Sequence, residues 1–184
     1  MLRPLTILVA AGLLLCASRP SLAHDRSWPG KRLGDTLPEA NTFAQKQATL
    51  TAPQISWLEK NLGESLRTED RTPRFYVGTA KDGAIAGTVL FLDATGVNGK
   101  IEIGLAIAPS GQVVRVVLFE HSESGSLASL TFLGQFAGKK AADKFKVGVD
   151  VTSPSGDERG AQILATAIRR GLLLAMAGLR PVGK

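Results

Sequence analysis

Apolar and polar residues alternate with a period of two along the middle of the chain, from Phe75 to Glu120. This alternation is typical of strands with one buried face. It predicts four strands, over 75–79, 84–92, 100–108 and 112–120. Turn signals such as Lys81-Asp82-Gly83 and Pro109-Ser110-Gly111 separate them. Because turns this short cannot carry a parallel crossover, the sheet is expected to be an antiparallel meander.

Helical spacing of apolar residues appears on both sides of these strands. Two short helices are expected at Glu39–Leu50 and Pro53–Leu62, the second capped by Thr51 and ended by Gly63. A helical turn is expected at 127–136. The longest helix is predicted at Ala161–Met176, where apolar side chains form one stripe. The predicted fold class is α+β, with a long C-terminal helix packed on the sheet.

The first 23 residues have the form of a secretory signal. Arg3 precedes an apolar run, and Ser21-Leu22-Ala23 is a small-x-small cleavage site. The run has about a dozen residues, whereas roughly 20 are needed to cross a bilayer. The expected organisation is a signal peptide at 1–23, a flexible lead-in at 24–38 and a single domain at 39–184. Export to the periplasm after cleavage near Ala23 is expected, and retention of the segment as an inner-membrane anchor is the alternative.

Composition excludes several kinds of site. The chain has one cysteine, Cys16, which cleavage would remove, so the exported protein would have neither a disulfide nor a thiolate metal site. Cleavage also removes two arginines and no acid, so the formal net charge falls from +6 to +4. There is no basic run, and nucleic-acid binding has no support. Copper chelation by an N-terminal His24 would want a second imidazole, and only His121 is available. No metal site is therefore expected.

Two motifs carry a family resemblance. Phe132 to Lys139 reads FLGQFAGK, and it follows a charged turn that contains His121, Glu123 and Gly125. The segment SGDERGAQILATAI, starting at Ser155, then opens the last helix. In this order the motifs resemble the FMN-binding domain of the flavoprotein subunits of Rnf/Nqr-type bacterial redox pumps. The similarity runs from about Phe75 to Leu174.

The resemblance implies a flavin site and also shows where the chain departs from the family. Family members esterify the FMN phosphate to the threonine that ends a Ser-Gly-Ala-Thr motif. Ser155-Gly156 match the start of that motif, but Asp157 and Glu158 take its third and fourth positions. Glutamate has no hydroxyl to form the ester, and two carboxylates repel a phosphate. Non-covalent binding of FMN is therefore expected, or none.

The residues expected around a flavin come from three segments. His121, Glu123 and Gly125 lie in the turn after the last strand, where the first two would share a side and could also be a simple polar strand end. The central motif adds Phe132, Phe136, Gly138 and Lys139, for which core packing and a solvated turn are the alternatives. Ser155, Gly156 and Glu158 lie at the start of the last helix, where Ser-x-x-Glu is also a capping box.

No catalytic residues are expected, because in a flavoprotein the isoalloxazine supplies the redox chemistry. The resulting hypothesis is an exported electron-transfer flavoprotein, or an accessory to one, with a redox partner in the cell envelope and association with the membrane. An electron carrier or binding protein is favoured over an enzyme with its own catalytic residues. The alternative is a cofactor-free member of the family that acts as a binding or assembly module.

Overall fold

The computed structural model describes residues 29–179. A five-stranded antiparallel sheet forms its centre, and its strands follow one another in chain order. They are β1 (Thr42–Gln47), β2 (Arg74–Thr79), β3 (Ile85–Thr95), β4 (Lys100–Ile107) and β5 (Val113–Leu118). The helices are α1 (Gly30–Thr36), α2 (Ala52–Leu62), α3 (Leu130–Gly134) and α4 (Glu158–Leu179), with a 3₁₀ turn, η1, at Glu69–Arg71. The expected α+β class, antiparallel meander and long C-terminal helix are confirmed.

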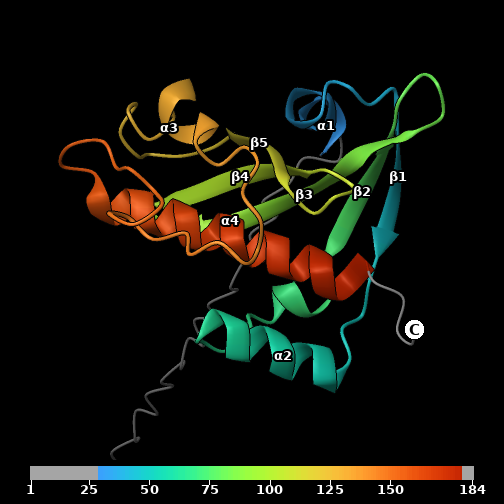
Figure 1. The fold of residues 1–184 in the computed structure, drawn as a ribbon, viewed down its shortest axis with the longest axis horizontal. Coiled ribbons are helices and arrows are strands. Elements are labelled where there is room, and N and C mark those ends of the chain that lie inside the picture. Colours follow the sequence, from blue (N-terminus) through green and yellow to red (C-terminus); the bar gives the residue numbers. More distant parts are fainter. Residues whose placement is uncertain (1–28, 180–184) are drawn as a thin grey trace, which may run out of the picture.

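Helix α4 crosses one face of the sheet, and α1 lies on the other (Figure 1). The main core lies beneath α4, where Leu90, Leu92, Ile103 and Leu105 of the sheet pack against the helix. Although α4 is long and apolar enough to cross a membrane, most of its apolar window is buried inside the domain. Its length and hydropathy are therefore explained by its position in the core. Leu179, at its end, is the last described residue.

The second face of the sheet is also covered, whereas the alternation in 100–108 suggested a polar or small-residue surface there. Leu33 and Leu37 of the α1 region pack against Val89 and Ala106. Gly104 permits this close approach, since a Cβ there would lie 2.6 Å from the Thr36 hydroxyl oxygen. The small residues on this face therefore make room for a helix.

Two predictions for the N-terminal third are wrong. The described part of the 24–38 lead-in contains α1, because Leu37 is buried against the sheet, Leu33 packs beside it and Arg32 binds Glu102 at 2.6 Å. The helix predicted at Glu39–Leu50 is strand β1, which pairs with β2 along its whole length. Helix propensity is a weak preference, and pairing with an open sheet edge overrides it. The signal-peptide prediction falls outside the described residues.

Helix α2 agrees with its prediction. The Gln54 side chain accepts a hydrogen bond from the Thr51 amide, and Gly63 ends the helix in the left-handed conformation with φ of 78°. These are the local signals that marked the two ends in the sequence.

Candidate functional site

The turn after β5 is held in place by Glu123. Its carboxylate is buried and accepts a hydrogen bond of 2.8 Å from the Asn98 amide, in the turn between β3 and β4. The same carboxylate reaches the first turn of α4, because a Cβ on Gly160 would lie 3.3 Å from Glu123 Oε2. Glu123 therefore joins three segments of the chain. It does not project into solvent.

Leu127 fills the space between this turn and α4. The side chain is 1% exposed, and its Cδ1 atom would lie 2.5 Å from a Cβ added to Gly160. The flavin expected from the sequence would lie between this turn, the central motif and the start of the last helix. Between the turn and the helix that volume is taken by the leucine and the glutamate, so a ring cannot enter there without displacing them.

The start of α4 is satisfied by side chains of the protein itself. Asp157 precedes the helix and accepts hydrogen bonds from the hydroxyls of Ser124, at 2.6 Å, and Ser126. These two bonds lower the pKa of Asp157, so it is anionic at neutral pH. A negative charge at this point also complements the positive end of the helix dipole. A phosphate would meet a carboxylate there instead of free amide groups.

The capping box expected from Ser155 to Glu158 is not formed. The helix begins at Glu158, and Ser155 and Gly156 lie in the turn before it. The Glu158 carboxylate accepts from the amide of Gly156 at 3.2 Å, and not from that of Ser155. The helix starts later than the motif suggested because Asp157 is held by the two serines of the preceding turn.

The central motif positions the loop that leads to α4. Gln135 forms two hydrogen bonds with the backbone of Thr152, donating to its carbonyl at 3.0 Å and accepting from its amide at 2.8 Å. Its side chain thus pairs with the loop as a neighbouring strand would. The motif holds in place the stretch just before Ser155.

The two aromatic residues of the motif are buried in the core. Phe132 meets the ring of Phe136 edge-on, at 5.5 Å between centroids, and Phe136 stacks on Phe145 at 6.2 Å. Phe136 is completely buried. The rings of Phe132 and Phe136 therefore pack in the core beneath the loop.

Asp150 organises the same loop. It accepts hydrogen bonds from the amides of Phe145 and Lys146, at 3.1 and 2.8 Å, and from the Lys139 ammonium group at 3.1 Å. Burial alone raises the pKa of Asp150, but these hydrogen bonds outweigh it and hold the pKa below its usual value. Lys139 is thus used within the protein, although 15% of its side chain remains exposed. Phe145 has a φ of 52°, a conformation that non-glycine residues rarely adopt.

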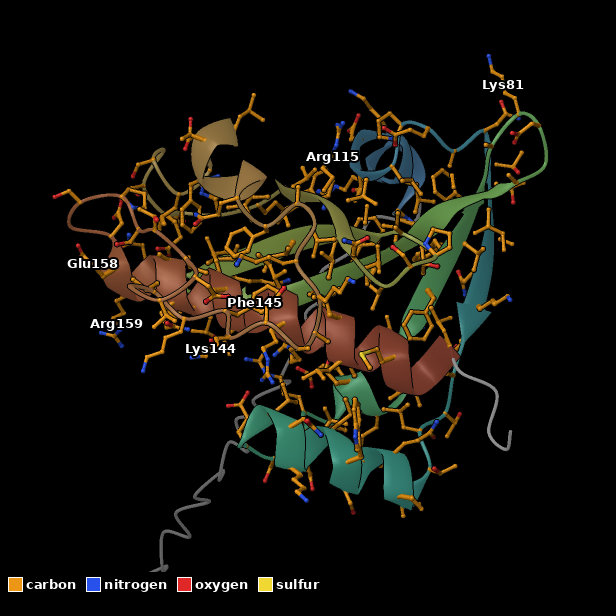
Figure 2. The ribbon with its side chains drawn as sticks, viewed as in Figure 1. Lys81, Arg115, Lys144, Phe145, Glu158 and Arg159 are labelled. Atoms are coloured by element: carbon orange, nitrogen blue, oxygen red, sulfur yellow. The ribbon has the colours of Figure 1, made fainter. Side chains whose placement is uncertain are left out.

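An open depression of about 570 Å³ lies on this loop. It is lined by 147–153 and by Glu158. Thr152 and Ser153 are the hydroxyl residues of its lining, and neither hydroxyl donates a hydrogen bond to another residue in the described part of the chain. Figure 2 shows Glu158 and Arg159 at the start of α4, on the same side of the molecule as Lys144 and Phe145. Hydroxyls, backbone groups and the carboxylates of Asp150 and Glu158 thus meet at one exposed place.

The structure brings the predicted site residues together only in part. Glu158 lines the depression, and Lys139 and Phe136 support it from behind. Glu123 belongs to the filled space beside Gly160, while Gly125 is exposed and Gly138 forms a turn with φ of 81°. His121 is half-buried, and its Nδ1 atom is buried without a hydrogen-bond partner.

Sequence reasoning missed the residues that shape the loop. Gln135 lies in the FLGQFAGK motif but had no predicted role, and Asp150 lies outside both motifs. Gln162 of α4 also binds the loop, through the Val147 amide and the Phe145 carbonyl. A glutamine that pairs with a distant loop leaves no regular pattern in the sequence, so these contacts could not be predicted. Among residues 29–179, no group of three or more histidine, cysteine, aspartate or glutamate side chains could hold a metal ion.

The fold is therefore an antiparallel meander with a C-terminal helix packed on one face. The loop at 145–153, which the central motif holds in place, leads into that helix. A solved structure with this fold is NqrC from Shewanella oneidensis. It matches with a TM-score of 0.54 and 14% sequence identity, over 82% of this chain and 88% of that one. A scan against protein-family profiles and a search of curated proteins each found no match. At this identity the likeness shows a distant NqrC-like fold.

Proposed function

We propose that this chain is an exported NqrC-like flavin-domain protein, which binds FMN non-covalently and passes electrons to a partner protein in the cell envelope. The observation that carries the proposal is the convergence of the central motif on one loop. Gln135, Phe136 and Lys139 each contact 145–152, the segment that leads to the position where the resembled family carries its flavin. The motifs and the NqrC-like fold both support a flavin-domain protein.

The residues present fit one part of FMN better than the other. Thr152 and Ser153 offer hydroxyls to the ribityl chain or phosphate. The charged residues of the lining are Asp150 and Glu158, and the exposed Lys146 and Arg159 follow only as sequence neighbours of Val147 and Glu158. The helix start does not fit a phosphate, because Asp157 occupies it. The flavin, when bound, supplies the one- and two-electron chemistry. The protein holds it in the loop and leaves one side open to a partner.

Non-covalent binding follows from the chemistry of the attachment position. Glu158 has no hydroxyl that could form a phosphoester, so the protein holds FMN only by reversible contacts. Export places the domain in the periplasm, either free after cleavage near Ala23 or anchored by residues 1–23. Association with the membrane then follows from the anchor or from the redox partner.

A titration of the purified chain with FMN tests the proposal. Binding is expected to quench flavin fluorescence and to be weakened about tenfold or more by Thr152→Ala combined with Ser153→Ala, which removes two hydrogen-bonding groups. Thr68→Ala, at an exposed hydroxyl in the turn before η1, is the matched control and should leave binding unchanged. Intact mass is expected to show no adduct of roughly 440 Da, which a phosphoester-linked FMN would add.

A second candidate function is favoured by the filled space at Leu127. A family member that no longer binds a cofactor would have no reason to keep that volume open, and it would act as a binding or assembly module in a redox system. No change in fluorescence at millimolar FMN would rule out the flavin carrier and leave this module.

A further inference from the structure

Strands β2 and β3 separate before their ends. Their pairing stops at Tyr76 and Val89, although β2 begins at Arg74 and β3 continues to Thr95. Beyond that point each strand keeps its other neighbour, since β1 pairs with β2 as far as Arg74 and β4 pairs with β3 as far as Thr95. The sheet is therefore forked here, and a pocket of about 340 Å³ opens between the two strands.

Two arginines take over part of the missing strand pairing. The carbonyl of Asp93 accepts hydrogen bonds from Arg170 Nη2 at 2.6 Å and from Arg67 Nη1 at 3.0 Å. Arg170 comes from the middle of α4 and is only 4% exposed, so the helix places a guanidinium group at the floor of the fork. Such a buried cation is costly unless its charge and its hydrogen bonds are both satisfied.

The charge of Arg170 is satisfied, but its hydrogen bonds are not complete. Its Nε atom lies 3.4 Å from Oδ2 of Asp70, which is 8% exposed and belongs to η1. Both atoms are buried, and neither has a hydrogen-bond partner among residues 29–179. Burial also raises the pKa of Asp70 despite the nearby guanidinium group, as expected for a carboxylate with too few donors. The pocket thus contains one unused acceptor beside one unused donor.

Among the other charges around the pocket, two carboxylates are paired, and Glu69 and Arg74 carry opposite charges. Glu102 binds Arg32 and Lys100, and Lys100 also lies 3.3 Å from Asp93. No excess of positive or negative charge remains to attract an ion. A single water molecule, which takes about 30 Å³ in the liquid, would leave most of the pocket unused.

We propose that the fork between β2 and β3 binds a small neutral molecule that carries a carboxamide group. Its N–H donates to Asp70 Oδ2, and its carbonyl oxygen accepts from Arg170 Nε. A carboxamide carries a donor and an acceptor on one carbon, which matches two protein groups that lie side by side. Phe91 and Leu92, which also line the pocket, provide apolar surface for the rest of the molecule. This site is separate from the loop at 147–153 and does not depend on flavin binding.

Three probes of nearly equal shape test the proposal on the full chain. Acetamide is neutral, acetate is negative and acetamidinium is positive. In a titration followed by amide chemical shifts, acetamide is expected to shift Asp70, Asp93 and Arg170, with a dissociation constant on the order of 1–10 mM for so small a ligand. The two charged probes are expected to bind at least tenfold more weakly. Equal shifts from all three, or none from acetamide, would overturn the proposal.

Variants separate the site from a general effect on the fold. Asp70→Leu alone leaves Arg170 without its ion-pair partner and can unfold the chain. The double change Asp70→Leu with Arg170→Met replaces both charges by apolar side chains, which proteins commonly tolerate. This variant is expected to stay folded and to lose acetamide binding at least tenfold, whereas Asp35→Leu, at an exposed carboxylate of α1, should bind as the parent chain does. Unchanged binding by the double variant would contradict the assignment.

Discussion

Replacing Gln135 by alanine is the most direct test of the loop that carries the proposed flavin site. The change removes both hydrogen bonds between the side chain and the backbone of Thr152, together with a bond of 2.9 Å to the Phe132 carbonyl. Phe136 and its aromatic neighbours keep their contacts, because their rings are buried independently of the amide. The expected result is a loop that opens more often while the core stays intact.

The size of the effect follows from the bonds that are lost. A typical intramolecular hydrogen bond contributes about 0.5–1.5 kcal/mol, so the two bonds to Thr152 stabilise the closed loop by roughly 1–3 kcal/mol. Since about 1.4 kcal/mol corresponds to a factor of ten, the Thr152 amide should exchange with solvent roughly 5 to 150 times faster. Amides in the middle of α4, which sit in the main core, should exchange at their original rates.

Hydrogen exchange followed residue by residue provides the measurement, and Gln112→Ala provides the control. The Gln112 side chain donates a long bond of 3.3 Å to the Gly138 carbonyl and accepts one of 3.0 Å from the Ser110 hydroxyl. Its loss should leave the Thr152 amide unaffected. If Gln135→Ala accelerated exchange equally in α4 and in the loop, the side chain would support the whole fold, and the reasoning about a motif-held loop would be refuted.

Three further predictions concern packing, acidity and the helix start. Gly171→Ala should destabilise the fold by about 1 kcal/mol in urea unfolding, because a Cβ there would lie 2.5 and 2.6 Å from two buried leucines. This overpacking outweighs the gain in helix propensity. Gly34→Ala, with open space around it, should raise stability by up to about 1 kcal/mol. Burial raises the pKa of Glu102, but hydrogen bonds from Arg32 and Lys100 lower it by more, so the net pKa lies below its usual value. The ionised carboxylate therefore stabilises the fold at neutral pH, and this contribution is lost as pH falls below about 4.3. Glu102→Gln should flatten the dependence of the unfolding free energy on pH in that acid range. Glu158→Thr should tighten FMN binding roughly two- to fivefold by removing an exposed negative charge, whereas Glu64→Thr should not change it.

The parts of the fold that the sequence predicted are those with local signals. β4 alternates residue by residue, and the ends of α2 are marked by Thr51 and Gly63, so both could be located without knowing their neighbours. β1 could not, because Thr42–Gln47 becomes a strand only through pairing with β2, and five of its six side chains are exposed. α1 was missed for a similar reason, since its short apolar face has meaning only against the sheet.

The candidate site shows the same limit. The motif from Phe132 to Lys139 located the correct region, but its spacing could not show that Gln135 reaches across to Thr152. Ser155 and Glu158 satisfied the pattern of a capping box, yet the serines at 124 and 126 bind Asp157 and set a later start for the helix. Contacts between residues 17 to 33 positions apart decided the outcome, and local spacing contains no record of them.

The N-terminus of α4 is the place where this domain differs most clearly, in its suitability for a flavin phosphate, from the family that it resembles. A helix N-terminus attracts a phosphate through free amide groups and the helix dipole. Here Asp157 already supplies the negative charge, and two serine hydroxyls hold it in position. A phosphate at the same point would have to displace that carboxylate or accept its repulsion. Under the proposed function, a flavin would therefore depend on the loop at 147–153. It would be held reversibly, and the open side of the depression would leave it exposed to exchange and to a partner.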